Sequence, residues 1–291
     1  MNLEQRVENV HIRQTGLQAV KRCWWLLVLI SFATLAASWL LWQGTAWVAD
    51  RVVGTPDLPS SINGMTAPES ANALVHGILY VLVMPLVIGL NTGRHAMLLD
   101  MVRREPTPTG MHLRTMLRWL KRCMKTAQLA LWMLLWMFLW GFAAFLGIVM
   151  AMLFSAALPP LETLLAVVSF LGGAALMIVT CLRYSLAFFA LADSPERGVT
   201  ECLNDSKLIM SGNLLRFLKL HGPVIGTAIL LFLILELTAQ ILAAVMGNAL
   251  YEPICSVLAT LVSFGISLVF EAVTAAFYDR RMKALNRFSR L

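Results

Sequence analysis

Charged side chains are scarce in this 291-residue chain. Aspartate, glutamate, lysine and arginine make up 13% of the residues, whereas hydrophobic residues make up 59% and the mean hydropathy is +0.74. An ordinary soluble domain has about 25% charged and roughly 45–50% apolar residues. One soluble core cannot hide this much apolar surface, so the composition excludes an ordinary soluble protein and favours a lipid environment.

Motifs that carry catalysis or hold metals are also missing. The five cysteines and five histidines are scattered, and the sequence has no CxxC, HExxH, GxSxG or glycine-rich phosphate loop. Neither a disulfide framework nor a zinc site is therefore expected, and no cofactor. An enzyme is the least favoured class of protein. The net charge of +7 comes from basic clusters between apolar runs, which suits anionic lipid headgroups better than nucleic acid.

What the chain does have is six long apolar runs. Each can cross about 30 Å of hydrocarbon, which takes around 20 apolar residues in a helix. The first run, from Cys23, is longer than the roughly 7–15 apolar residues of a signal peptide, so we expect it to be retained. We predict an all-α, polytopic membrane helix bundle that forms a single domain over residues 1–291, with spans at about 24–48, 73–93, 127–154, 161–190, 218–246 and 252–278.

Two features shape these spans. Pro85 is expected to kink the short second span, and Pro159-Pro160 is expected to turn the chain between the third and fourth. The basic residues then orient the bundle. Of the 23 lysines and arginines, 22 lie before the first span, between Arg94 and Lys125, between Arg183 and Lys219, or after the sixth span, and the exception is Arg51. Positively charged loops stay in the cytoplasm. We therefore expect both termini to face the cytoplasm of a bacterial plasma membrane.

The loop between the second and third spans contains an amphipathic stretch, residues 111–125. One face is apolar, with Leu113, Met116, Leu117, Leu120 and Met124, and the opposite face carries Arg114, Arg118, Arg122 and Lys125. This pattern predicts a helix that lies in the membrane surface with its basic residues facing the headgroups. A cytoplasmic extension of the third span fits the pattern equally well.

A second connector lies between the fourth and fifth spans and reads ADSPERGVTECLNDSKLIMSGN, residues 192–213. Ser194 is expected to cap a helix that has Pro195 at its first position. Gly212-Asn213 provides a stop signal. Between them, apolar or small residues recur at near-helical spacing: Val199, Cys202, Leu203, Ser206, Ile209 and Met210. The pattern predicts a short cytoplasmic amphipathic helix under the bundle.

This connector and its flanks resemble the signature of a bacterial integral-membrane family called domain of unknown function 975. The matching residues are Tyr184-Ser185, Ala192-Asp193-Ser194-Pro195, Ser206, Met210 and Gly212-Asn213, and the later Phe277-Tyr278 is similar to that family's ending. The resemblance implies a multi-span membrane protein, with Tyr184, Asp193, Pro195, Ser206, Met210, Gly212 and Asn213 as its motif residues. It assigns no substrate and no catalytic residue.

Polar residues within the spans are the other candidates for function. Glu236 lies deep in the fifth span, and Gln240 follows one helical turn later, so the two side chains are expected to hydrogen-bond. The carboxyl group serves either as a proton or cation relay or as a neutral group that links helices. Glu271 and Arg183 lie near the cytoplasmic ends of their spans and are expected to pair, as a structural ion pair rather than a substrate clamp.

Three hypotheses follow. The first is a non-enzymatic accessory, scaffold or regulatory subunit, whose basic face contacts anionic lipid headgroups, another membrane protein or a second copy, with no role for nucleic acid. The second is a transporter of a small solute or lipid, with Glu236 lining the route through the bundle. The third and least favoured is a lipid-modifying membrane enzyme.

Overall fold

The computed structural model describes residues 3–22, 24–53, 61–62, 65–103, 114, 118–154, 159–246 and 248–288. In chain order, the elements are α1 (Leu3–Arg22), α2 (Trp24–Val53), β1 (Ser61–Ile62), β2 (Met65–Thr66), α3 (Ala67–Arg103), the 3-10 helix η1 (Trp119–Arg122), α5 (Cys123–Phe154), α6 (Pro159–Tyr184), α7 (Ala187–Asp193), α8 (Val199–Met210), α9 (Leu214–Met246) and α10 (Asn248–Phe288). The two-residue strands pair antiparallel, with Ser61 opposite Thr66. The predicted all-α class is confirmed.

Six stretches of the described helices are long and apolar enough to cross a membrane, as predicted. They are Trp24–Val52, Ala73–Arg103, Trp119–Val149, Val167–Asp193, Leu214–Gln240 and Cys255–Leu285. Several of their bounds differ from the predicted ones, and two differences change the architecture. α3 is not short but continues past Pro85 to Arg103, because the residues from Ala96 to Leu99 pack into the core. The fourth run is not one helix, because a turn at Ser185–Leu186 separates α6 from α7.

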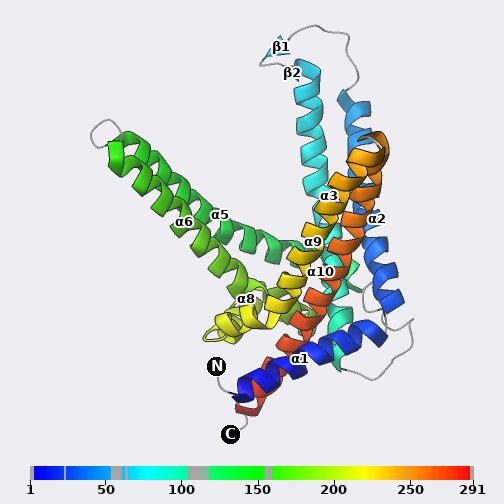
Figure 1. The fold of residues 1–291 in the computed structure, drawn as a ribbon, viewed down its shortest axis with the longest axis vertical. Coiled ribbons are helices and arrows are strands. Elements are labelled where there is room, and N and C mark those ends of the chain that lie inside the picture. The colour runs from blue at the N-terminus through cyan, green and yellow to red at the C-terminus, as the bar shows by residue number, and fades with distance from the viewer. Residues whose placement is uncertain are drawn as a thin grey trace.

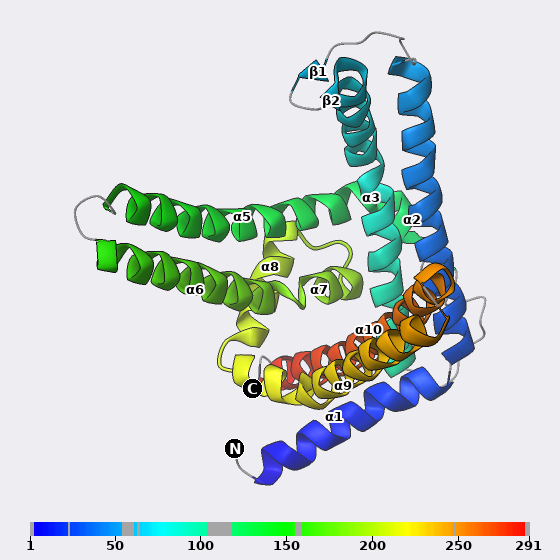
Figure 2. The ribbon, with the colours of Figure 1, turned by 45° about the horizontal axis from the view of Figure 1, so that its top comes forward.

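The long helices form three antiparallel pairs, α2–α3, α5–α6 and α9–α10, which point in different directions from one common region (Figure 1; Figure 2). We call this region the base. It comprises α1, η1, α7, α8, the first turns of α9, and the ends of α3 from Thr92 and of α10 from Leu268. The largest fully buried side chains lie in the base or where a helix joins it: Ile12, Leu27, Ile30, Met97, Leu98, Leu129, Leu186, Leu191, Met210, Phe217, Phe277 and Tyr278.

The pairs join the base in two ways. α3 and α10 run without a break from their pairs into the base. By contrast, α5 follows η1, α6 ends at the Ser185–Leu186 turn, and α9 follows a turn over residues 211–213. In that last turn Gly212 has φ +73°, a left-handed conformation that glycine adopts without the steric cost of a Cβ atom. The predicted stop signal is confirmed.

Helix α1 was not predicted, and it packs across α10 in the base (Figure 2). Its buried positions are Asn9, Ile12, Gly16 and Ala19, which recur at the spacing of one helical face. A Cβ atom on Gly16 would lie 3.0 Å from the Ala272 carbonyl oxygen and 3.0 Å from the Val273 Cα. The missing side chain therefore allows the two helix backbones to approach closely.

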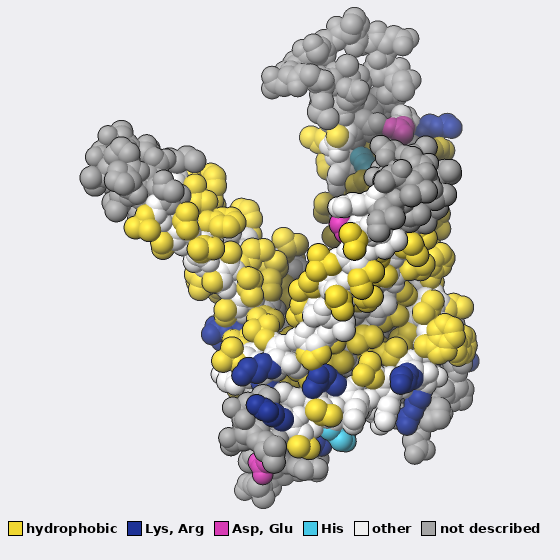
Figure 3. Space-filling view, in the orientation of Figure 1, with side chains coloured by type: hydrophobic (Ala, Val, Ile, Leu, Met, Phe, Trp, Pro, Cys, Tyr) yellow, Lys and Arg dark blue, Asp and Glu magenta, His cyan; other side chains and the backbone are white. Residues whose placement is uncertain are grey.

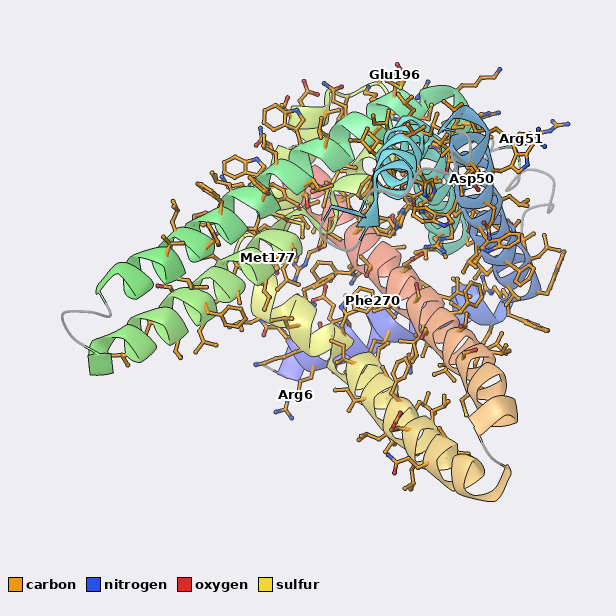
Figure 4. All side chains as sticks on the ribbon, turned by 90° about the horizontal axis from the view of Figure 1, so that it is seen from above. Arg6, Asp50, Arg51, Met177, Glu196 and Phe270 are labelled. Atoms are coloured by element: carbon orange, nitrogen blue, oxygen red, sulfur yellow. The ribbon has the colours of Figure 1, made fainter. Side chains whose placement is uncertain are left out.

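Basic side chains gather around the base on the face shown in Figure 3, whereas apolar side chains cover the helices above it. The exception is Arg51 at the opposite end of α2, beside Asp50 (Figure 4). The Arg51 guanidinium lies over the Trp47 ring, 4.9 Å from its centroid. The charge asymmetry along the sequence thus becomes an asymmetry between the two ends of the molecule.

Candidate functional site in the base

The second connector contains the predicted helix, α8. All six residues of its predicted apolar face, Val199, Cys202, Leu203, Ser206, Ile209 and Met210, are buried. Burial raises the pKa of the Cys202 thiol, which keeps this cysteine protonated and unreactive at neutral pH. The apolar underside of the connector is therefore confirmed, and it faces protein.

The predicted start of this helix is wrong. Ser194 ends α7, where its N–H donates to the Ala190 carbonyl oxygen at 3.1 Å. A residue before proline is disfavoured in the α conformation, so Pro195 forces this break. Helix α8 begins at Val199, and the N–H of Gly198 donates to Glu201 Oε2 at 3.3 Å. Glu201, in the first turn of α8, thus binds a backbone donor at the helix start.

Polar motif residues of the connector attach it to its neighbours. The buried Ser206 hydroxyl donates to the Arg183 carbonyl oxygen at 2.7 Å, which links α8 to the end of α6. Asn213 Nδ2 donates to the Ile209 carbonyl oxygen at 2.9 Å. Both bonds satisfy carbonyl groups that a helix end leaves without an intrahelical partner. These residues therefore act as structural caps.

A charged network joins α3, α7 and α10. Arg103 Nε donates to Asp279 Oδ1 at 2.7 Å, and Arg103 Nη1 pairs with Asp193. The buried Tyr278 hydroxyl donates to Asp193 Oδ2 at 3.2 Å, and Lys283 Nζ binds Asp279 Oδ2 at 2.6 Å. We name these five residues the Arg103 cluster. Sequence reasoning identified Asp193 and the Phe277-Tyr278 ending, but it missed Arg103 and Asp279.

Glu271 pairs with Arg94 of α3, not with Arg183. The distance between Arg94 Nη2 and Glu271 Oε1 is 2.5 Å, and the Ser267 hydroxyl donates to the same oxygen at 3.3 Å. The predicted pairing is wrong because Arg183 is exposed at the end of α6, whereas α3 packs beside α10. Among the described atoms, Arg94 Nε and Glu271 Oε2 have no hydrogen-bond partner, so the pair is only partly satisfied.

A buried histidine, which sequence reasoning left unassigned, lies on α9. The His221 ring lies between the rings of Phe217 and Phe270, tilted by 43° to each, with ring centroids 4.2 and 4.1 Å away. Its Nδ1 lies 3.0 Å from the Phe217 carbonyl oxygen and its Nε2 lies 3.0 Å from Thr274 Oγ1. Both ring nitrogens have partners, so His221 serves to hold α9 against α10.

The predicted hydrogen bond in the fifth span is present. Gln240 Nε2 donates to Glu236 Oε1 at 3.4 Å. The predicted position of Glu236 inside the bundle is wrong, because both side chains are exposed on α9. In its most apolar window, no residue of this span is buried. Only one face of α9 packs against α10, and the pair lies on another face.

The four basic residues predicted to face lipid headgroups fall into two groups. Arg122 Nη2 binds Glu196 Oε1 at 2.7 Å, and Lys125 Nζ donates to the Pro195 carbonyl oxygen at 2.8 Å. These two contacts hold the start of α5 to the loop before α8. Arg114 and Arg118 are exposed. Leu113, Met116 and Leu117 of the predicted interfacial helix lie outside the described residues.

Within the parts of the chain that the structure describes, no group of three or more His, Cys, Asp or Glu residues is placed to hold a metal ion. The chain matches no protein-family model, no curated protein and no solved structure. Its resemblance to domain of unknown function 975 stays a prediction. The six apolar helices are compatible with a multi-pass membrane protein.

Proposed function

We propose that this protein is a non-enzymatic accessory or scaffold subunit of a bacterial plasma membrane, which binds a partner membrane protein along α9. The exposed Glu236–Gln240 pair carries this proposal. α9 continues to Met246, about 15 Å of helix beyond Glu236. Polar side chains that face lipid at this depth are costly and are normally covered by protein. A polar group on a partner helix would remove that cost by hydrogen bonding across the interface.

The base supports the same reading. Its charged residues make contacts within the chain: Arg94 with Glu271, Arg103 with Asp193 and Asp279, and Arg122 with Glu196. These contacts join helices to one another or, for Arg122 and Glu196, a helix to the loop before α8, as expected of a structural hub. The three helix pairs diverge from this hub (Figure 2), which leaves their apolar flanks open to lipid and to partner helices.

The transporter hypothesis gains no support from Glu236. A transport route needs its polar groups on an inner surface between helices, and the described Glu236 side chain is exposed instead. For orientation, we propose that the base faces the cytoplasm, where Arg114 and Arg118 meet anionic headgroups. We also propose that the chain belongs to the family of domain of unknown function 975, since the connector residues that carry the resemblance hold the base together.

Site-specific photo-cross-linking in cells tests the proposed interface. A photoreactive residue at Leu233 lies beside Glu236 on the helix surface, and one at Ile234 lies nearly opposite. Both positions are exposed, so they form a matched pair. We expect a defined protein adduct from position 233, lost in Glu236→Leu, and lipid adducts from position 234.

Two results would contradict this proposal, one on the interface and one on the identity of the partner. Lipid adducts alone at both positions would show that no protein covers Glu236. An adduct that contains two copies of this chain would replace the partner protein with a second copy.

A further inference from the structure

An open groove runs between α1, α9 and α10, with a volume of about 530 Å³. This size lies in the range of about 300–1,000 Å³ that small-molecule sites occupy. Apart from Arg13 and Thr227, all of its lining side chains are apolar or glycine. The Thr227 hydroxyl is already bonded within α9, to the carbonyl oxygens of Pro223 and Val224. The groove is therefore lined by apolar side chains and has one available charged group, the guanidinium of Arg13.

The groove has a charged end and an apolar end. Arg13 and Leu17 belong to α1, which crosses α10 at Val273 in the base. From there the groove follows α10 to Leu261 and α9 from Pro223 to Leu231. These stretches correspond to about 18 and 12 Å of helix, and they lie within two candidate spans. The apolar part thus lies where hydrocarbon is expected, and Arg13 lies at the level of the base.

Arg13 is available for a ligand. In the described part of the chain, no carboxylate lies within ion-pair distance of it, and its Nε makes one long hydrogen bond, 3.5 Å, to the Asn9 carbonyl oxygen. The remaining guanidinium N–H groups are free to bind a phosphate oxygen, which arginine does with a planar, charge-assisted pair of bonds.

We propose that this groove binds one anionic phospholipid, with an acyl chain along α9 and α10 and the phosphate on Arg13. Charge complementarity and the position of the groove select this occupant. Gly265 lines the groove, and a Cβ atom there would meet nothing within 4 Å. A larger side chain at this position therefore fills the groove without disturbing the backbone.

Native mass spectrometry of the purified full-length protein tests the proposal. The probes are phosphatidylglycerol and phosphatidylcholine with identical acyl chains. Both lipids offer a phosphate to Arg13, but the choline ammonium of phosphatidylcholine offsets the phosphate charge and is repelled by the guanidinium. We therefore expect about tenfold stronger retention of phosphatidylglycerol. Arg13→Gln is expected to abolish this preference. Gly265→Leu and, as a second filling variant, Ile266→Phe are expected to reduce the retention of both lipids.

Matched controls separate the groove from general effects. Arg6→Gln removes another arginine of α1, one that points away from the molecule (Figure 4), and Gly172→Leu fills open space on α6. Both are expected to bind lipid like the wild type, and excess inorganic phosphate is expected not to displace the lipid. Equal retention of the two lipids, wild-type binding in both filling variants, an equal loss in the controls, or displacement by phosphate alone would each overturn the proposal.

Discussion

The two halves of α10 have different surroundings although both are rich in apolar residues. From Ala272 to Asp279, every residue is buried, whereas Val257 and Leu261 in the other half are 58% and 59% exposed. The buried half crosses α1 and α3, and its small residues, Ala272, Ala275 and Ala276, allow these helices to approach. In a bilayer, packing and hydrogen bonds hold helices together, since lipid is as apolar as leucine. Stability should therefore concentrate in the base.

The largest expected effect comes from core packing in the base. Phe277 is fully buried and meets Phe217 edge to face, with ring centroids 5.3 Å apart. Phe277→Ala should reduce the free energy of unfolding by about 3–5 kcal/mol, because it leaves a cavity. Phe232→Ala on the exposed part of α9 should change it by less than about 1 kcal/mol. Titration with SDS in mixed micelles measures both. Equal losses would remove the contrast between the two regions.

The Arg103 cluster should give the next largest effect. Arg103→Gln leaves the carboxylates of Asp193 and Asp279 without their shared cation, and their side chains are only 18% and 9% exposed. We expect a loss of about 3 kcal/mol, because stranding a buried charge costs more than the pair itself contributes. The control is Arg122→Gln, whose partner Glu196 is 87% exposed, and it should cost less than about 1 kcal/mol. If the control matched Arg103→Gln in the same titration, the cluster would have no special role.

Two glycine substitutions should have opposite signs. Gly16→Ala places a Cβ atom against the α10 backbone, so it should destabilise the protein by about 1–3 kcal/mol. Gly44→Ala on α2 meets open space. It should stabilise by about 0.5–1 kcal/mol, because alanine restricts the unfolded chain and favours helix. Thermal denaturation of the two variants in detergent compares them. A stabilised Gly16→Ala would show that α1 does not pack closely on α10.

The smallest expected effect is a pH dependence at the edge of the base. Partial burial alone would raise the pKa of Glu8, but the hydrogen bond and charge of Arg216, whose Nη2 lies 2.7 Å from Glu8 Oε2, outweigh it and lower the pKa. The contact therefore stabilises the folded state fully above the unfolded pKa and is lost as pH falls through the lower folded value.

Unfolding titrations of wild type and Glu8→Gln at several pH values isolate this contribution. The wild type should be more stable by less than about 1 kcal/mol at pH 7. The difference should shrink as pH falls below the unfolded pKa of glutamate, about 4.3, and vanish below the lowered folded pKa of Glu8. A difference that grew as pH fell would contradict the assignment.

Local patterns in the sequence predicted local structure well. The spacing of Cys202, Ser206 and Met210 correctly identified the buried face of α8, and Gly212-Asn213 correctly marked its end. Gln240 binds Glu236 as expected one helical turn apart. Each prediction depends on residues a few positions apart, for which helix geometry fixes the neighbour.

Long-range partners were beyond the reach of the same reasoning. Glu271 had several basic residues at a similar depth, and only the packing of α3 beside α10 selects Arg94 over Arg183. The preference of serine for the start of a helix led to a wrong prediction for Ser194. In the structure, Ser194 follows the last residue of α7, and α8 begins at Val199. The role of Gly16 depends on the packing of α10 against α1. The sequence does not indicate which helix, if any, approaches a given glycine.

The sequence alone indicated a lipid environment and the long apolar helices. Composition and run length specify six apolar helices, and the positions of Lys and Arg specify which ends of those helices are charged, because both depend on the chemistry of single segments. Tertiary structure alone decided which apolar surfaces meet protein and which carboxylates meet which arginines. It also decided that Glu236 lies outside the bundle and that Arg13 stands at the end of an apolar groove. Such contacts join residues far apart in the chain, and hydropathy is the same for a side chain that faces lipid and one that faces another helix.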